Sequence, residues 1–186
     1  MTPKEAKKRL RVAVTQVKRS LSPDQKEAGS MSALSRLEQL PLFLAAEKVL
    51  LYHALPDELQ TAPLLEKWEK SKQLFLPVVQ GENLLIKPYR RGETTIGRFG
   101  ITEPAGEATL PPHEIELAII PGVAYGFNGA RLGRGKGFYD RLLEQLSCPC
   151  IGICFEQQLY PEIPVEPHDR PMDLIVTPER VVYCKP

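Results

Sequence analysis

A glycine-rich, basic stretch from Pro121 to Leu143 is the part of this sequence best suited to chemistry. It holds six of the chain's 13 glycines, and four cations alternate with them: Arg131, Arg134, Lys136 and Arg141. Glycine tolerates positive φ and lets backbone amides come close to a ligand. Amides and basic side chains beside the start of a helix form a site for anions, above all phosphates. Because Gly-x-Gly-x-Gly running into an apolar helix is not how flexible linkers are built, the stretch predicts a phosphate-binding loop.

The loop departs from the two common nucleotide-binding patterns, Gly-x-Gly-x-x-Gly with a distant ribose acid and Gly-x4-Gly-Lys-Ser/Thr. Lys136 is followed by glycine rather than by a hydroxyl that would bind magnesium. Asp140 can take that part, since a carboxylate just beyond a phosphate loop can hold Mg²⁺. An acid in the first turn of a helix is also common for its effect on the helix dipole alone. The residues therefore predict an ATP- or phosphate-binding protein and leave kinase, ligase and non-catalytic sensor open.

The first 21 residues predict an amphipathic helix that begins at Thr2-Pro3. Two of its cations, Lys7 and Arg11, are four residues apart and point the same way, so they could close over phosphates. Most of the basic residues on this helix are expected simply to form a solvated face; they are Lys4, Lys7, Lys8, Arg9, Arg11, Lys18 and Arg19.

Acidic and histidine residues supply the other candidates. Pro56-Asp57-Glu58 follows a predicted strand, at the end where open α/β sheets bind ligands, although a simple polar turn explains it equally well. Neighbouring residues of an extended chain point to opposite sides, so Asp169 is a better candidate for Mg²⁺ than His168 is for a catalytic base. His53 and His113 have no matching partners in the sequence and are expected to be structural or surface residues.

The elements that must position these residues alternate along the chain. This alternation predicts an α/β fold, a single three-layer domain over residues 1–186 with a largely parallel central sheet flanked by helices, Rossmann-like in class. Helices are expected at 2–21, from Ser22 to about Leu40, at 61–68 and after the glycine-rich loop, and strands at 47–55, 74–79, 83–88, 117–120, 150–155, 174–176 and 181–184. The segment 89–112 contains no clear element. Loops of that length are often lids or binding loops, and we expect one here.

Composition narrows the class of protein. A formal net charge of +1 argues against a general nucleic-acid binder. No run of about 18 apolar residues is present, so no membrane span is expected, and the first residues lack the apolar segment of a signal peptide. The four cysteines do not show zinc-finger spacing, which predicts reduced and mostly buried thiols in a cytoplasmic protein. The near-neutral charge and the lack of a coiled-coil pattern favour a monomer.

The glycine-rich stretch closely resembles the signature of the 5-formyltetrahydrofolate cyclo-ligase family, also called 5,10-methenyltetrahydrofolate synthetases. Pro121-Gly122 and then Asn128 to Asp140, NGARLGRGKGFYD, agree with the family pattern PG…G-x-R-L-G-x-G-x-G-(Y/F)-Y-D. Supporting matches run nearly end to end: the basic N-terminal helix, the 52–61 segment with Glu58, Gly100 to Pro104, and 164–169. A signature of this length is far more specific than a lone glycine triplet.

The resemblance implies that 5-formyltetrahydrofolate and ATP are converted to 5,10-methenyltetrahydrofolate, ADP and phosphate with Mg²⁺ required. It also implies residue roles. Lys136 and Arg134 would be catalytic, Asp140 would hold Mg²⁺ with Asp169 as a weaker second candidate, and Glu58 would hydrogen-bond the pterin. His53, at a position that is apolar in some relatives, would lie in the folate site with Phe138 and Tyr139. The ATP site would comprise Lys7, Arg11, Arg131, Gly133, Arg134, Gly135, Lys136, Gly137, Phe138 and Tyr139.

Two other functions remain to be compared with this one. A phosphotransferase acting on another small acid would turn over ATP without specificity for folate. A non-catalytic homologue that binds folate or a nucleotide would not need Lys136, Asp140 and Glu58 together, and the presence of all three favours the enzyme.

Overall fold

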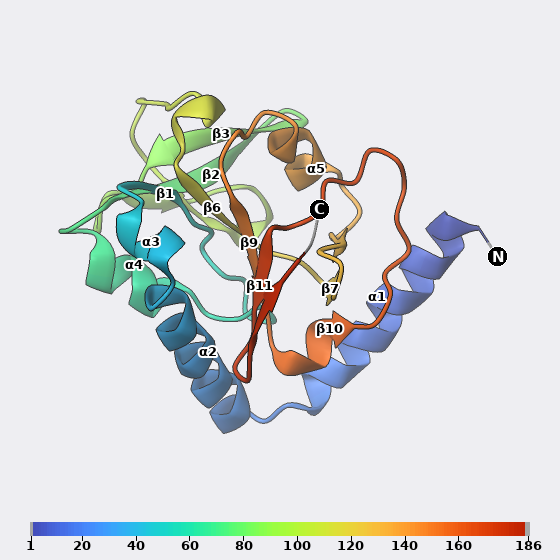
Figure 1. The fold of residues 1–186 in the computed structure, drawn as a ribbon. Helices are drawn as coiled ribbons and strands as arrows, with labels where there is room; N and C mark the ends of the chain where they lie inside the picture. The colour runs from blue at the N-terminus through green and yellow to red at the C-terminus, as the bar shows by residue number, and fades with distance from the viewer. Residues whose placement is uncertain (1, 185–186) are drawn as a thin grey trace.

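A seven-stranded sheet forms the centre of the computed structural model, which describes residues 2–184 (Figure 1). The strand order is β12-β11-β9-β6-β1-β2-β3. The five inner strands are parallel, while the edge strands β3 and β12 run antiparallel to their neighbours. The largely parallel sheet expected from the sequence is thus confirmed. The bounds are β1 Lys48–Leu50, β2 Gln73–Gln80, β3 Asn83–Pro88, β6 Leu117–Ile120, β9 Cys150–Ile153, β11 Leu174–Val176 and β12 Val181–Tyr183.

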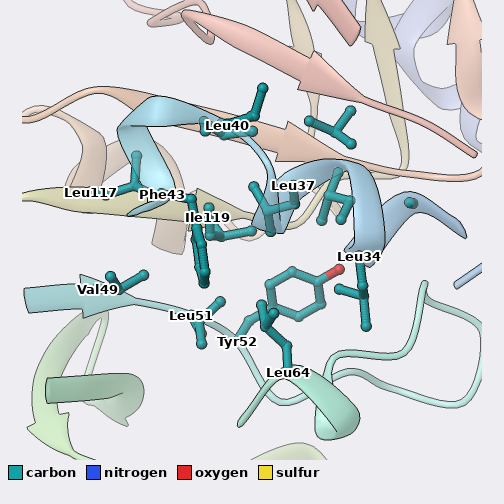
Figure 2. Packing of buried hydrophobic residues seen from close by; sticks show 14 of the residues in the cluster. Leu34, Leu37, Leu40, Phe43, Val49, Leu51, Tyr52, Leu64, Leu117 and Ile119 are labelled. Carbon is teal, nitrogen blue, oxygen red and sulfur yellow. The ribbon is translucent and has the colours of Figure 1, made fainter. Parts of the chain in front are cut away.

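Three helices cover one face of this sheet: α2 (Pro23–Glu38), α3 (Pro41–Ala45) and α4 (Ala62–Trp68). Figure 2 shows Leu37 of α2 and Phe43 of α3 packed over Val49 and Ile119, which belong to neighbouring strands. Val49 and Leu51 point to this face and Leu50 to the opposite one, as the alternation of side chains along a strand requires. The strands are apolar on both faces because both are covered.

The opposite face is covered by α5 (Phe138–Leu143), whose Leu142 and Leu143 pack with Leu50 and Ile120. Beside α5 lies a small sheet of order β10-β7-β8, made of Leu159–Tyr160, Ala124–Gly126 and Arg131–Leu132. Two of these strands lie inside the glycine-rich stretch, where no strand was expected. This outer layer therefore combines a helix with a sheet.

Helix α1 (Pro3–Ser20) packs on the small sheet rather than on the central one (Figure 1). Its fully buried Val14 lies in a cluster with Ala124 and Leu132. The predicted helix starts are confirmed, because Thr2 with Glu5 and Ser22 with Gln25 form capping boxes in front of α1 and α2.

The second helix ends at Glu38, close to the expected end near Leu40, and a short helix starts at Pro41. The first strand was predicted too long, since it covers only Lys48–Leu50 of the expected 47–55. The segment 89–112 is not without structure. It contains a hairpin of β4 (Thr94–Ile96) and β5 (Thr102–Pro104) and the 3₁₀ turns η1 (Arg98–Gly100) and η2 (Pro112–Glu114). Strands of three residues are too short to show an alternating pattern.

The remaining structural expectations concern membranes and thiols. Within residues 2–184, no helix has the length and apolar character needed to cross a bilayer. All four cysteines are free, with Cys148, Cys150 and Cys154 buried and Cys184 partly exposed, as expected. Burial raises the pKa of the Cys154 thiol, which keeps it protonated and unreactive. The cytoplasmic location stays a prediction.

Candidate active site

A cavity of about 320 Å³ opens where several strands end. The parallel strands β1, β2 and β6 are neighbours, so their carboxyl ends lie at the same edge of the sheet. The chain continues from β1 into 52–58 and from β6 into Pro121-Gly122, and both continuations line the cavity. The β4–β5 hairpin and the residues 133–140 complete the walls. This is the position at which open α/β sheets bind ligands.

Most of the residues that the sequence analysis selected meet in this cavity. Its lining includes His53, Glu58, Arg131, Gly133, Arg134, Gly135, Lys136, Gly137, Phe138, Tyr139 and Asp140. Lys7, Arg11 and Asp169 are not part of the lining. Their roles, like those of the residues in the cavity, stay predictions.

Two glycines set the course of the loop around Lys136. Gly135 and Gly137 have φ of 94° and 72°, values that side chains of L-residues rarely allow, and Gly137 ends the loop directly before α5. The Lys136 ammonium lies 4.1 Å from the ring centroid of Phe99, on the hairpin across the cavity. In the described chain Lys136 forms no ion pair with a carboxylate. Its charge is therefore available to an anionic ligand.

Arg134 joins the glycine-rich loop to the turn after β1. Its Nη2 donates to Asp57 Oδ1 at 2.7 Å and to Glu58 Oε1 at 3.0 Å. The other oxygen of Glu58 accepts from the backbone N–H of Leu55 at 2.9 Å. Partial burial works against the charge, but the bonds to the two acids raise the pKa of Arg134 overall. Thus an expected ATP-binding residue is bonded to the expected pterin-binding residue.

Lys18 extends this ion-pair network to α1. Its Nζ lies 2.8 Å from Asp57 Oδ2, and its side chain is only 4% exposed. Lys18 is thus not part of the solvated face expected for α1, and Lys7 is buried as well. Burying an ammonium requires a partner, and in each case the partner lies more than 35 residues away in the sequence, out of reach of local pattern analysis.

Arg131 stabilises the loop from within. Its buried guanidinium donates to the Pro121 carbonyl at 3.1 Å and to Asp140 Oδ1 at 2.5 Å, and it lies 5.8 Å from the Tyr139 ring centroid. The bond to Arg131 fixes one oxygen of Asp140, whose side chain is about one third exposed at 36%. Burial, and secondarily the charge of Glu58, raises the pKa of Tyr139, so this phenol is a hydrogen-bond donor at neutral pH.

The predicted residues outside the cavity contact one another or the back of the loop. Lys7 Nζ lies 2.7 Å from both Asp169 Oδ2 and Glu166 Oε2. Ligand atoms of Glu166, His168 and Asp169 lie within 4.8 Å of one another, but the Lys7 ammonium already occupies this acidic cluster. Arg11 Nε donates to the Gly133 carbonyl at 2.8 Å. Arg11 therefore contacts the loop from outside the cavity.

The β4–β5 hairpin supplies lining residues that the sequence analysis did not assign to the site: Phe99, Ile101, Thr102 and Glu103. Asp57 was expected either near a ligand, at the end of a strand, or in a simple polar turn, and was given no role of its own. The available signal for the hairpin was the match of Gly100 to Pro104 to the family pattern, which was not converted into residue roles.

The ion pairs of α1 make the stability of the fold depend on pH. Burial raises the pKa of Asp57, but Lys18 and Arg134 outweigh it and hold this pKa below its usual range; Lys7 does the same for Asp169. A carboxylate whose pKa is lowered by folding stabilises the folded state at any pH above its pKa in the unfolded chain, which is about 4. This stability is lost as the pH falls toward the lower pKa of the folded chain. We expect the thermal midpoint to drop as the pH is lowered below about 4.

Asp57→Asn should lower the midpoint at pH 7 and flatten its acid dependence in thermal unfolding followed by circular dichroism. Glu162→Gln, at an exposed position, is the control. If the thermal midpoints of Asp57→Asn and wild type depend on pH in the same way, then the ion pair of Lys18 with Asp57 does not stabilise the fold.

Comparison with known proteins agrees with this geometry. The chain matches the description of the 5-formyltetrahydrofolate cyclo-ligase family over residues 3–178. It is 32% identical to the 5-formyltetrahydrofolate cyclo-ligase of Escherichia coli K12, over 90% of this chain and 98% of the relative. It is 33% identical to that of Mycolicibacterium smegmatis over 99% of both chains. Its fold matches the NMR structure of Aquifex aeolicus 5,10-methenyltetrahydrofolate synthetase with a TM-score of 0.89 at 32% identity, covering 97% of this chain and 93% of the other.

A match over nearly the whole chain, with relatives of almost equal length, covers the cavity and every element that lines it. The protein belongs to the 5-formyltetrahydrofolate cyclo-ligase family.

Proposed function

We propose that the cavity binds ATP and 5-formyltetrahydrofolate side by side and closes the ring of 5,10-methenyltetrahydrofolate, with release of ADP and phosphate. One observation carries the proposal: the glycine-rich loop, whose Lys136 forms no ion pair within residues 2–184, faces an apolar wall that contains Tyr139 and the hairpin. A surface suited to phosphates and an aromatic surface thus line the same cavity. The chain is proposed to work as a single domain and a monomer.

The reaction needs ATP because a formamide is a poor electrophile and its oxygen is a poor leaving group. In the proposed sequence the formyl oxygen attacks the γ-phosphorus, the bond to the bridging oxygen breaks, and ADP leaves. N10 then attacks the activated carbon and loses its proton, and phosphate departs with the former formyl oxygen. Phosphoryl transfer asks a protein mainly for positioning and charge neutralisation.

On the ATP side, we assign charge neutralisation to Lys136, Arg134 and the amides of Gly133 to Gly137. Arg131 supports this surface through Pro121 and Asp140. Arg11 supports the loop from outside the cavity. Lys7 would bind a phosphate only after breaking its ion pairs with Glu166 and Asp169.

Asp140 is the residue proposed to hold Mg²⁺, since a hard carboxylate oxygen suits this ion and Arg131 occupies only one of its two oxygens. Bound there, Mg²⁺ would neutralise charge on the phosphates. Asp169 fits less well, because it does not line the cavity and the Lys7 ammonium, 2.7 Å from its Oδ2, would repel a second cation.

On the folate side, we assign Glu58, His53, Phe138 and Tyr139 to the walls of the pterin site. Glu58 would contact the substrate while it holds Arg134. That bond couples the two halves of the site, because a shift of Glu58 on folate binding also shifts a residue assigned to ATP.

The purified protein with Mg-ATP and 5-formyltetrahydrofolate is expected to generate the near-ultraviolet absorbance of the methenyl product. Chelation of Mg²⁺ should abolish the signal and added Mg²⁺ should restore it. Absence of the signal, with both substrates shown to bind, would leave a non-catalytic binder. ATP turnover that does not depend on folate would instead favour a phosphotransferase.

A further inference from the structure

A buried carboxylate in the hairpin wall of the cavity has no role in the assignments above. Glu103 lies on β5, is only 7% exposed and lines the cavity. Burial of a carboxylate is costly unless hydrogen bonds or a cation compensate it. In residues 2–184, however, Glu103 forms no salt bridge.

This carboxylate accepts few hydrogen bonds from the protein itself. Oε1 accepts one hydrogen bond, from the N–H of Val79 at 3.3 Å. In the described chain no fully buried side-chain oxygen lacks a partner, so the unbonded Oε2 keeps some exposed surface, on a residue that lines the cavity. The carboxylate packs directly on Gly97, where a Cβ would lie 1.9 Å from Oε2. Only glycine leaves room for the carboxylate in this position.

Glu58 differs from Glu103 in this respect. Both of its oxygens are engaged, one by the N–H of Leu55 and the other by Arg134. Each carboxylate oxygen can accept about two hydrogen bonds, but Glu58 keeps the shape of its turn and holds Arg134 with those that it makes. Of the two glutamates that line the cavity, Glu103 is therefore the one with an oxygen that accepts no hydrogen bond from the described chain.

We propose that Glu103 recognises the donor edge of the pterin ring by accepting hydrogen bonds from N3–H and the 2-amino group of 5-formyltetrahydrofolate. This inference rests on the proposed function. Two adjacent N–H donors match a carboxylate, which accepts charge-assisted hydrogen bonds with both oxygens. The surrounding apolar lining, Val79, Leu84, Ile101 and Phe138, suits the faces of the ring and keeps water from competing.

Glu103→Gln tests the proposal with little change of shape. Its amide oxygen can still accept from Val79, but its NH₂ group replaces an acceptor with a donor that faces the donors of the ligand. The Kd of 5-formyltetrahydrofolate, measured by calorimetry, is expected to rise about 10- to 100-fold, because hydrogen bonds to a charged acceptor are lost. The KM of ATP and the thermal midpoint should not change. Glu107→Gln, on the same segment but exposed, is the matched control.

A folate analogue with methyl in place of the 2-amino group provides the second arm. Wild type should bind the analogue about 10-fold or more weakly than the natural ring, whereas Glu103→Gln should show little further loss. Equal losses in the two proteins would overturn the proposal. If Glu103→Gln does not fold, the wild-type protein still tests the proposal, because equal affinity for the natural ligand and the analogue would contradict it. Wild type that neither binds nor converts 5-formyltetrahydrofolate would instead refute the proposed function.

Discussion

Lys136→Met is expected to lower kcat about 100- to 1,000-fold, the loss seen when one preorganised charge or donor at a reacting group is removed. Three lysine and arginine side chains line the cavity, and two of them already form ion pairs with carboxylates of the protein. Arg131 is bonded to Asp140, and Arg134 to Asp57 and Glu58. Within residues 2–184 the Lys136 ammonium contacts the Phe99 ring and no carboxylate, so a triphosphate can attract it away from the ring at little cost. Its charge is therefore the one most fully available to the transition state.

The measurement is steady-state formation of the methenyl product, with ATP and folate varied separately. Lys136→Met should raise the KM of ATP and leave the Kd of 5-formyltetrahydrofolate within about twofold, because the lost charge faces phosphate and not the pterin. Lys70→Ala, at an exposed position of the same charge, is the control. A variant that loses folate affinity and keeps its kcat would mean that the two halves of the cavity are assigned the wrong way round.

The difference between charged residues that are paired within the protein and those that are not also explains what the sequence could and could not predict. Gly135, Lys136 and Gly137 were predicted as a phosphate loop because their chemistry is local: positive φ and a cation occur together within a few residues. The contact of Arg134 with Glu58 joins positions 76 residues apart, and no local pattern encodes it. The sequence therefore predicted which loop residues lie together, and these line the cavity, but not which of them are already paired.

The secondary structure was likewise predicted where the local signal is strong and missed where it is weak. Long helices with capping boxes and buried strands such as Leu117–Ile120 have strong periodic or apolar signals, and both were predicted. The small sheet was missed because β7 and β8 are two or three residues long and lie among glycines. Glu103 was missed for a related reason, since its hairpin strand is short and adjoins a turn with positive φ at Phe99.

A second large effect is expected in stability, at Gly152 on the central strand β9. The fully buried ring of Tyr125 lies on Gly152, where a Cβ would be 2.4 Å from Cε1 of the ring. It also covers Gly122, where a Cβ would be 2.7 Å from Cζ, and its hydroxyl donates to the Ile120 carbonyl. Tyr125 thereby attaches the small sheet, and with it the start of the glycine-rich loop, to the central sheet.

Gly152→Ala is therefore expected to destabilise the fold by about 3 kcal/mol, at the upper end of the usual cost of overpacking, because neither the ring nor the strand has space to move. Urea unfolding measures the loss. Gly106→Ala is the matched control, since no atom lies within 4 Å of the Cβ that it would add. Tyr125→Leu in the Gly152→Ala background should recover part of the loss by removing the clash, a coupling that additive effects would not give. If Gly152→Ala is as stable as Gly106→Ala, then the packing of Tyr125 is not what joins the two sheets.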